Sequence, residues 1–173
     1  MTDLFDWRIA LGDIGDNGIK GSHTATPEEC KELTRVTDIV SCDRLVVDYK
    51  IQPLRSGIYR LTGLLQADVV QRCVVSLEPV KEHINEPLNT ELRPTDMLPE
   101  GVQDVEEMSI LETPDFAPIE DDVIDLGLIV LEHFSTSINP YPRAPGVELD
   151  VKDAGADGPV NPFAVLEQLK QKP

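Results

Sequence analysis

The 173-residue chain is long enough for one domain with its own core, and with 40% hydrophobic residues it needs no disulfide framework to fold. Aromatic residues make up only 5%, so we expect a mostly aliphatic core. The formal net charge of −17 repels phosphate backbones and anionic membranes and attracts basic partners.

The first predicted elements are an edge strand at 4–11 and a helix at about 27–38. Thr26 precedes a proline and is followed three residues later by Glu29, which is the pattern of a capping box. Helical spacing predicts that the following residues of this segment face the core: Cys30, Leu33, Val36 and Val40.

Alternating apolar residues from Leu45 to Ile51 predict a half-buried strand. Three further strands are expected at Ile58–Ala67, Val69–Leu77 and Glu82–Leu92, the last with Pro87 at a sheet edge. Short connections predict an antiparallel meander over 44–93 that is partly barrel-like. Gly63 inside the second of these strands indicates a bulge or a close backbone approach.

Residues 94–122 are predicted to be an acidic mobile loop with a short strand at Phe116–Ile119. Residues 94–142 hold 12 of the 32 acidic residues and no Lys or Arg. Asp121 and Asp122 are candidate N-caps for an apolar helix at about 123–135, which is either a core element or part of a protein interface.

The predicted organisation is one α+β domain at 1–143, an antiparallel sheet packed by two helices, followed by a flexible tail at 144–173. A short helix is expected near 162–170, with an N-cap, a proline at the first turn and an apolar stripe: Asn161, Pro162, Phe163, Leu166 and Leu169. A helix this short is not stable alone in water, so it docks either on its own domain or on a partner.

No motif for a nucleophile–base pair, a phosphate loop or a metal site occurs, so we expect no enzyme activity, cofactor, metal or small-molecule substrate. The cysteines Cys30, Cys42 and Cys73 are few and far apart, which argues against disulfides. Without a signal-peptide pattern or a long apolar run, a cytoplasmic protein that does not enter membranes is expected.

Two residue groups have alternative interpretations. Cys73 lies beside Arg72, whose charge would lower the pKa of the thiol, but a buried small residue in a strand is the simpler interpretation. The strand region also holds basic residues and two tyrosines that form either an RNA-binding patch or an ordinary solvated face. These are Arg44, Lys50, Arg55, Arg60, Arg72, Lys81, Tyr49 and Tyr59.

Four segments, QRCVVSLEPV, VIDLGLIVLEHF, NPYPRAPG and NPFAVLEQLK, occur in an order and spacing that resemble the YceD family of large ribosomal RNA subunit accumulation proteins. The resemblance covers about 44–170, and the first segment is similar to the α-proteobacterial branch. Some family members carry further cysteines that resemble a metal site, and this chain lacks them.

The resemblance implies a non-enzymatic, cytoplasmic role in the accumulation or processing of large-subunit (23S) ribosomal RNA. The expected partner is ribosomal RNA or a basic protein of the large subunit. Matching the family segments gives these partner-binding residues: Arg72, Cys73, Glu78, Asp125, Glu132, Asn161, Pro162, Phe163, Leu166 and Leu169. The alternative is a general protein-interaction adaptor unrelated to ribosomes.

Overall fold

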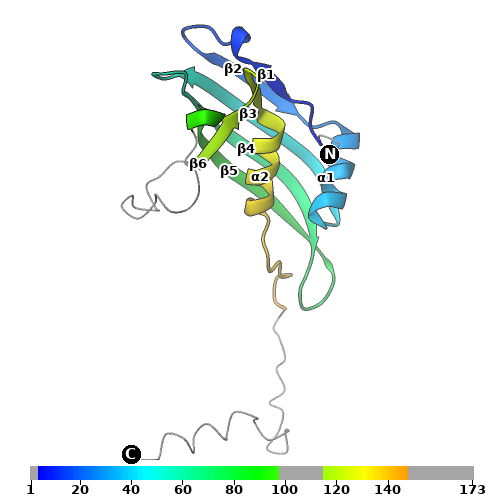
Figure 1. The fold of residues 1–173 in the computed structure, drawn as a ribbon. Helices are drawn as coiled ribbons and strands as arrows, with labels where there is room; N and C mark the ends of the chain where they lie inside the picture. The colour runs from blue at the N-terminus through cyan, green and yellow to red at the C-terminus, as the bar shows by residue number, and fades with distance from the viewer. Residues whose placement is uncertain (1–3, 98–114, 148–173) are drawn as a thin grey trace, which may run out of the picture.

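The computed structural model describes residues 4–97 and 115–147 as an α+β fold with two sheets and two helices (Figure 1). The five-stranded sheet has the order β2-β3-β4-β5-β6, with strands Ile19–Thr24, Ser41–Pro53, Tyr59–Arg72, Pro79–Pro94 and Asp115–Ile119. A two-stranded sheet pairs β1, Arg8–Ala10, with β7, Val123–Asp125. The helices are α1, Pro27–Thr37, and α2, Leu126–Ser137, and two 3-10 turns are Leu11–Asp13 and Thr95–Met97.

The large sheet is open, because β2 and β6 form its edges, and the expected partial barrel does not close. All pairings are antiparallel except that of β5 with β6. The expected α+β class with a mostly antiparallel sheet and two helices is therefore confirmed.

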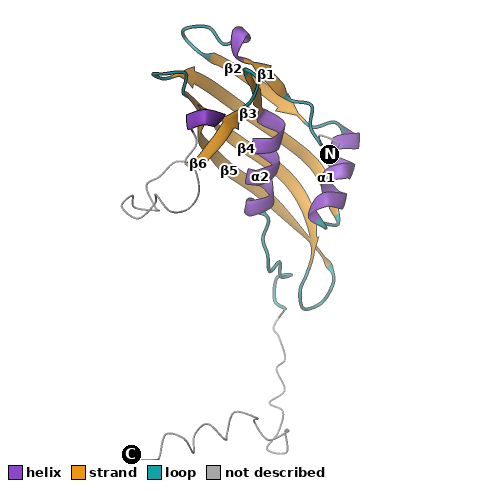
Figure 2. Ribbon diagram, viewed as in Figure 1, coloured by secondary structure: helices purple, strands orange, loops and turns teal. Residues whose placement is uncertain are grey.

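Both helices cover the same side of the large sheet (Figure 2). We call this side the covered face and the opposite side the open face. Residues such as Leu45, Val47, Leu61 and Leu65 alternate toward the covered face and join α1 and α2 in one core cluster. The aliphatic core expected from composition is thus built by strand alternation.

Helix α1 confirms the capping box. The Thr26 hydroxyl accepts a hydrogen bond from the Glu29 amide at 3.2 Å, and the Glu29 carboxylate accepts one from the Thr26 amide at 2.7 Å. Cys30 is buried in the core as predicted, but Val36 and Val40 are 53% and 47% exposed. The prediction that Val36 and Val40 face the core is therefore wrong, since Val36 is exposed near the end of α1 and Val40 lies beyond the helix.

The predicted strands Ile58–Ala67 and Val69–Leu77 are wrong as separate elements, because Tyr59–Arg72 is one continuous strand. The chain turns after it, where the Cys73 amide donates to the Glu78 carbonyl and Leu77 adopts a φ of 63°. Val75 lies in this turn and is only half-buried, so it is not the buried strand residue that the predicted strand Val69–Leu77 implied.

Helix α2 begins at Leu126, not at 123, since Val123–Asp125 forms β7. Asp121 and Asp122 are not its N-caps. They adopt φ values of 51° and 59° in a two-residue turn whose flanking residues hydrogen-bond each other. Asp125 caps the helix instead, its carboxylate accepting the Leu128 amide at 2.9 Å.

Other details of the strands are confirmed. A Cβ at Gly63 would lie 2.3 Å from the Asp48 carbonyl oxygen, so the close backbone approach is real. Pro87 pairs with β4 only, because β6 joins β5 from Thr90 onward. The expected strand at Phe116–Ile119 is β6, and the part of the acidic loop at 98–114 lies outside the described residues.

Candidate nucleic-acid interface

The open face collects most of the basic side chains of the described sheet. Direct cross-strand partners share a face, so the register places Lys20, Lys50, Thr62 and Asn89 in one row across four strands. By the same register and strand alternation the open face carries Lys20, Arg44, Lys50, Arg60, Arg72, Lys81 and Arg93. Its acidic residues are Asp48, Asp68 and Glu91.

At one corner of the open face, acidic and basic side chains form ion pairs with each other. Glu91, only 9% exposed, pairs with Arg60 at 3.5 Å and with the Arg93 Nε at 2.6 Å. The Arg93 guanidinium also lies 4.0 Å from the centre of the Phe116 ring. Nearer the middle of the sheet, Asp68 contacts the His83 Nδ1 at 2.7 Å. Two of the three acidic residues are therefore already engaged.

The remaining cations form no ion pair within the described part of the chain: Lys20, Arg44, Lys50, Arg72 and Lys81. Arg44 does, however, lie opposite Asp68 across β3 and β4. Lys20 and Lys50 are direct cross-strand neighbours, an arrangement that costs stability because like charges repel. A polyanion lying on this face would relieve that repulsion.

Both polar and apolar side chains lie between these cations: Thr62, Gln66 and Asn85 alternate with Val46, Leu64 and Val70. Gln66 donates to the Asn85 amide oxygen at 3.4 Å, and the ring of Phe116, which the register places beside Glu91, is half-buried under the Arg93 guanidinium. The expectation that Tyr49 and Tyr59 provide stacking faces is wrong, because both point to the covered face, where Tyr49 stacks on His23. With Tyr49 and Tyr59 on the covered face, the open face offers cations for phosphate contacts and few rings for base stacking.

Sequence reasoning missed Lys20 and Arg93. The strand β2 was hidden by the surrounding glycines, although Ile19, Gly21 and His23 alternate with more exposed residues. Arg93 lies two residues after Glu91 in β5, so strand alternation places both side chains on the same face and could have identified Arg93. Arg55, by contrast, lies in the β3–β4 turn and is not part of the face.

The partner-binding residues expected from the family segments do not form one site. Arg72, Cys73 and Glu78 meet at the end of the β4–β5 hairpin, whereas Asp125 is the last residue of β7 and Glu132 lies within α2. Asp125 serves as a helix cap, and Glu132 is exposed. The remaining five lie outside the described residues: Asn161, Pro162, Phe163, Leu166 and Leu169.

Cys73 is fully buried at the hairpin end but is not a member of the core cluster. Its sulfur accepts hydrogen bonds from the amides of Ser76 and Ala144, both at 3.3 Å, and of Val75 at 3.5 Å. Hydrogen bonding by the Ser76 side chain, then by the backbone amides, lowers the pKa of Cys73 to about 6. Arg72 is not the cause, since alternation directs it to the open face.

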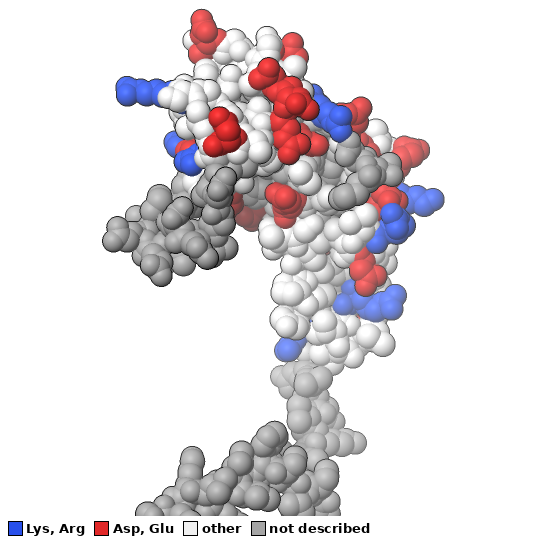
Figure 3. Space-filling view, viewed as in Figure 1, with Lys and Arg blue, Asp and Glu red and all other residues white. Residues whose placement is uncertain are grey.

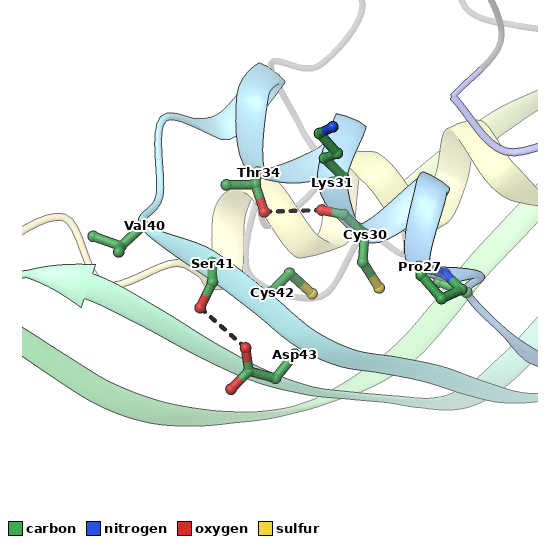
Figure 4. A pocket seen from close by; sticks show the side chains of 9 residues that line it. Pro27, Cys30, Lys31, Thr34, Val40, Ser41, Cys42 and Asp43 are labelled. Carbon is green, nitrogen blue, oxygen red and sulfur yellow. Dashed lines mark hydrogen bonds between the residues drawn. The ribbon is translucent and has the colours of Figure 1, made fainter.

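A hollow of about 370 Å³ lies between α1 and the start of β3, with the sulfur atoms of Cys30 and Cys42 facing it (Figure 4). Burial raises the pKa of both thiols, that of Cys42 to about 12. The Ser41 hydroxyl donates to the Asp43 carboxylate at 3.0 Å, and the Thr34 hydroxyl donates to the Cys30 carbonyl at 2.8 Å. These polar groups satisfy one another. The raised pKa values of Cys30 and Cys42 keep both thiols protonated at neutral pH.

The helix-bearing side has the opposite charge at its upper end. Figure 3 shows acidic side chains gathered toward the top of this view. In the turn before β7, Glu120, Asp121 and Asp122 are exposed. The two sides of the sheet therefore present different surfaces to a charged partner.

No helix in the described ranges is long and apolar enough to cross a membrane.

A search of curated proteins and a search of solved structures each found no match. The family model described as "Large ribosomal RNA subunit accumulation protein YceD" matches residues 61–170. That range covers more than half of the chain and runs from within β4 through β5, β6, β7 and α2. The chain therefore belongs to the YceD family of large ribosomal RNA subunit accumulation proteins.

Proposed function

We propose that this protein is a non-enzymatic assembly factor of the large ribosomal subunit that acts by binding ribosomal RNA through its open face. Membership of the family implies a role in the accumulation of large-subunit ribosomal RNA, and the family is not a known enzyme family. The observation that carries the binding mode is the set of cations without an ion pair on the open face of a chain with a net charge of −17.

The charge separation determines how RNA approaches. Because the whole chain is acidic, its long-range field repels a phosphate backbone from most directions. Lys20 and Lys50 lie side by side in one row, and Arg44 lies farther along β3 on the same face. Contacts to these residues release counterions from RNA, so binding weakens steeply as salt rises.

The acidic segment 94–122 has a complementary role in this proposal. Its charge attracts a basic ribosomal protein, so that one molecule contacts RNA with the open face and protein with the acidic segment. Neither contact requires a cofactor, a metal or a small molecule. Binding without chemistry also agrees with the mutually satisfied polar groups around the hollow between α1 and β3.

The test is sedimentation of the tagged full-length protein through sucrose gradients at low and high salt. Lys20→Glu changes the charge of the open face, and Lys31→Glu makes the same change on α1 as a matched control, since both lysines are exposed. We expect the wild type and Lys31→Glu to migrate with large-subunit precursors at low salt only. We expect Lys20→Glu to remain near the top of the gradient.

Equal losses for both variants would show that only net charge matters and would refute the assignment to the open face. Migration of the wild type at the top in every condition would favour the adaptor alternative. Unchanged levels of large-subunit ribosomal RNA after deletion of the gene would refute the proposed function as a whole.

A further inference from the structure

A groove of about 350 Å³ opens between the C-terminal ends of α1 and α2, on the covered side of the sheet. Its lining has no charged residue and consists of Val36, Thr37, Leu131, Ser135, Ile138 and Pro140. Val36 is 53% exposed, and Leu131 and Ile138 pack only partly against the core. The groove therefore leaves apolar surface in contact with water, which costs free energy in proportion to its area.

The surface around the groove has little charge. Beyond the C-terminal end of α2 the surface visible in Figure 3 is mostly uncharged, and Arg143 is an exposed cation of this segment. Three exposed charged residues lie beside the lining in sequence: Arg35 before Val36, Asp38 after Thr37 and Glu132 after Leu131. Arg35 pairs with Glu32, whereas neither carboxylate forms an ion pair within the described part of the chain. The groove thus suits an apolar segment that ends in positive charge.

We propose that residues 161–170 of this same chain dock in the groove. Phe163, Leu166 and Leu169 are spaced three residues apart, so a helix would present them on one face. The basic residues Lys170 and Lys172 follow this stripe, which matches the carboxylates beside the groove. Because so short a helix is unstable alone, its apolar stripe requires a surface such as this one.

The length of the connecting chain favours docking within one molecule. Pro140, in the groove lining, belongs to the segment that leads toward the tail, and 148–160 joins the last described residue to Asn161. A flexible chain of this length would have a root-mean-square span of roughly 20 Å. This span exceeds the length of α1, whose 11 residues extend about 16 Å, so such a chain can return to the groove at the end of that helix. The effective concentration of the tail at the groove is on the order of millimolar.

The experiment is amide hydrogen exchange of the full-length protein followed by mass spectrometry. The reference is a synthetic peptide of residues 158–173, which gives the exchange rates of the free segment. We expect the amides of 163–169 in the protein to exchange at least about tenfold more slowly than in the peptide, independently of protein concentration, as docking on folded structure requires.

Two variants, one on each side of the contact, should abolish this protection. Phe163→Ala with Leu166→Ala removes the apolar stripe and should also lower the melting temperature by several degrees. Val36→Asp places a charge in the groove at a position exposed enough for the domain to fold. Gln168→Ala, off the stripe, is the matched control and should retain the protection.

Exchange of the tail in the wild-type protein at the rates of the free peptide would overturn the proposal. Protection that disappears on dilution would assign the groove to a second copy of the chain. Protection that appears only when purified ribosomal particles are added would assign the tail to a partner. Either result also refutes docking within one molecule, and neither depends on the RNA-binding role of the open face.

Discussion

Replacing Lys20 with Gln should make the protein more stable and at the same time weaken its binding to RNA. Lys20 lies directly opposite Lys50 across β2 and β3, and neither has an ion-pair partner among the described residues. Two unit charges about 7 Å apart in a water-like dielectric repel by roughly 0.6 kcal/mol, within the range of about 0.2–1 kcal/mol for cross-strand pairs. Removing one charge should raise the melting temperature by about 1–2 °C.

The same substitution removes one phosphate contact. The slope of log affinity against log salt should therefore become shallower by about 0.7–0.9. The assays are thermal unfolding at low and high salt and filter binding of large-subunit ribosomal RNA over a salt series. Lys31→Gln on α1 controls for the loss of one charge. If Lys20→Gln leaves the melting temperature and the salt slope as Lys31→Gln does, the reasoning about the open face is refuted.

Three further predictions concern local features of the fold. Thr26→Ala removes the hydroxyl that accepts a hydrogen bond in the capping box of α1, and it should lower the free energy of unfolding in chemical denaturation by about 1 kcal/mol. An unchanged free energy of unfolding would indicate that the N-terminus of α1 frays in the native state. Gly63→Ala should lower the free energy of unfolding by about 1–3 kcal/mol or more, because the added Cβ would lie 2.3 Å from the Asp48 carbonyl oxygen. Gly12→Ala is the control for the substitution itself, since a Cβ there would have no atom within 4 Å. The thiol absorbance of Cys73 should titrate with a midpoint near pH 6 because hydrogen bonds lower its pKa to about 6. The pKa of Cys73 is lower in the folded than in the unfolded state, so the thiolate stabilises the fold fully above about pH 9, and this stabilisation is lost as the pH falls to about 6. Cys73→Ser should remove this dependence of stability on pH. An unchanged profile of stability against pH in the variant would contradict the prediction.

The sequence predicted those elements whose signals are local. The capping box at Thr26 and the alternation from Leu45 to Ile51 depend on neighbours in sequence, and both appear in the structure. The third strand failed because the apolar residues Val74 and Leu77 occupy a turn, where hydrogen bonds to the Cys73 sulfur override strand propensity.

The candidate interface was only partly predictable for a related reason. Arg44, Lys50 and Arg60 were recognised as a group, but which face they share depends on register across several strands. The undetected strand β2 supplies Lys20, and alternation from the observed register directs Tyr49 away from the cations. Pairing between distant segments is not encoded in any local window of the sequence.

The pairing of β1 with β7 has a consequence for the order of folding during synthesis. Strands β2 to β5 pair with their neighbours in chain order, so this part of the sheet can form as the polypeptide emerges. Strand β1 cannot, because its partner begins at Val123 and the Trp7 carbonyl accepts the Leu126 amide. Phe5, whose backbone packs against Gly127, also stays uncovered until then. More than a hundred residues therefore separate the first apolar segment from the residues that bury it, which predicts a late and slow closing step in which the exposed N-terminus is the part most open to chaperones.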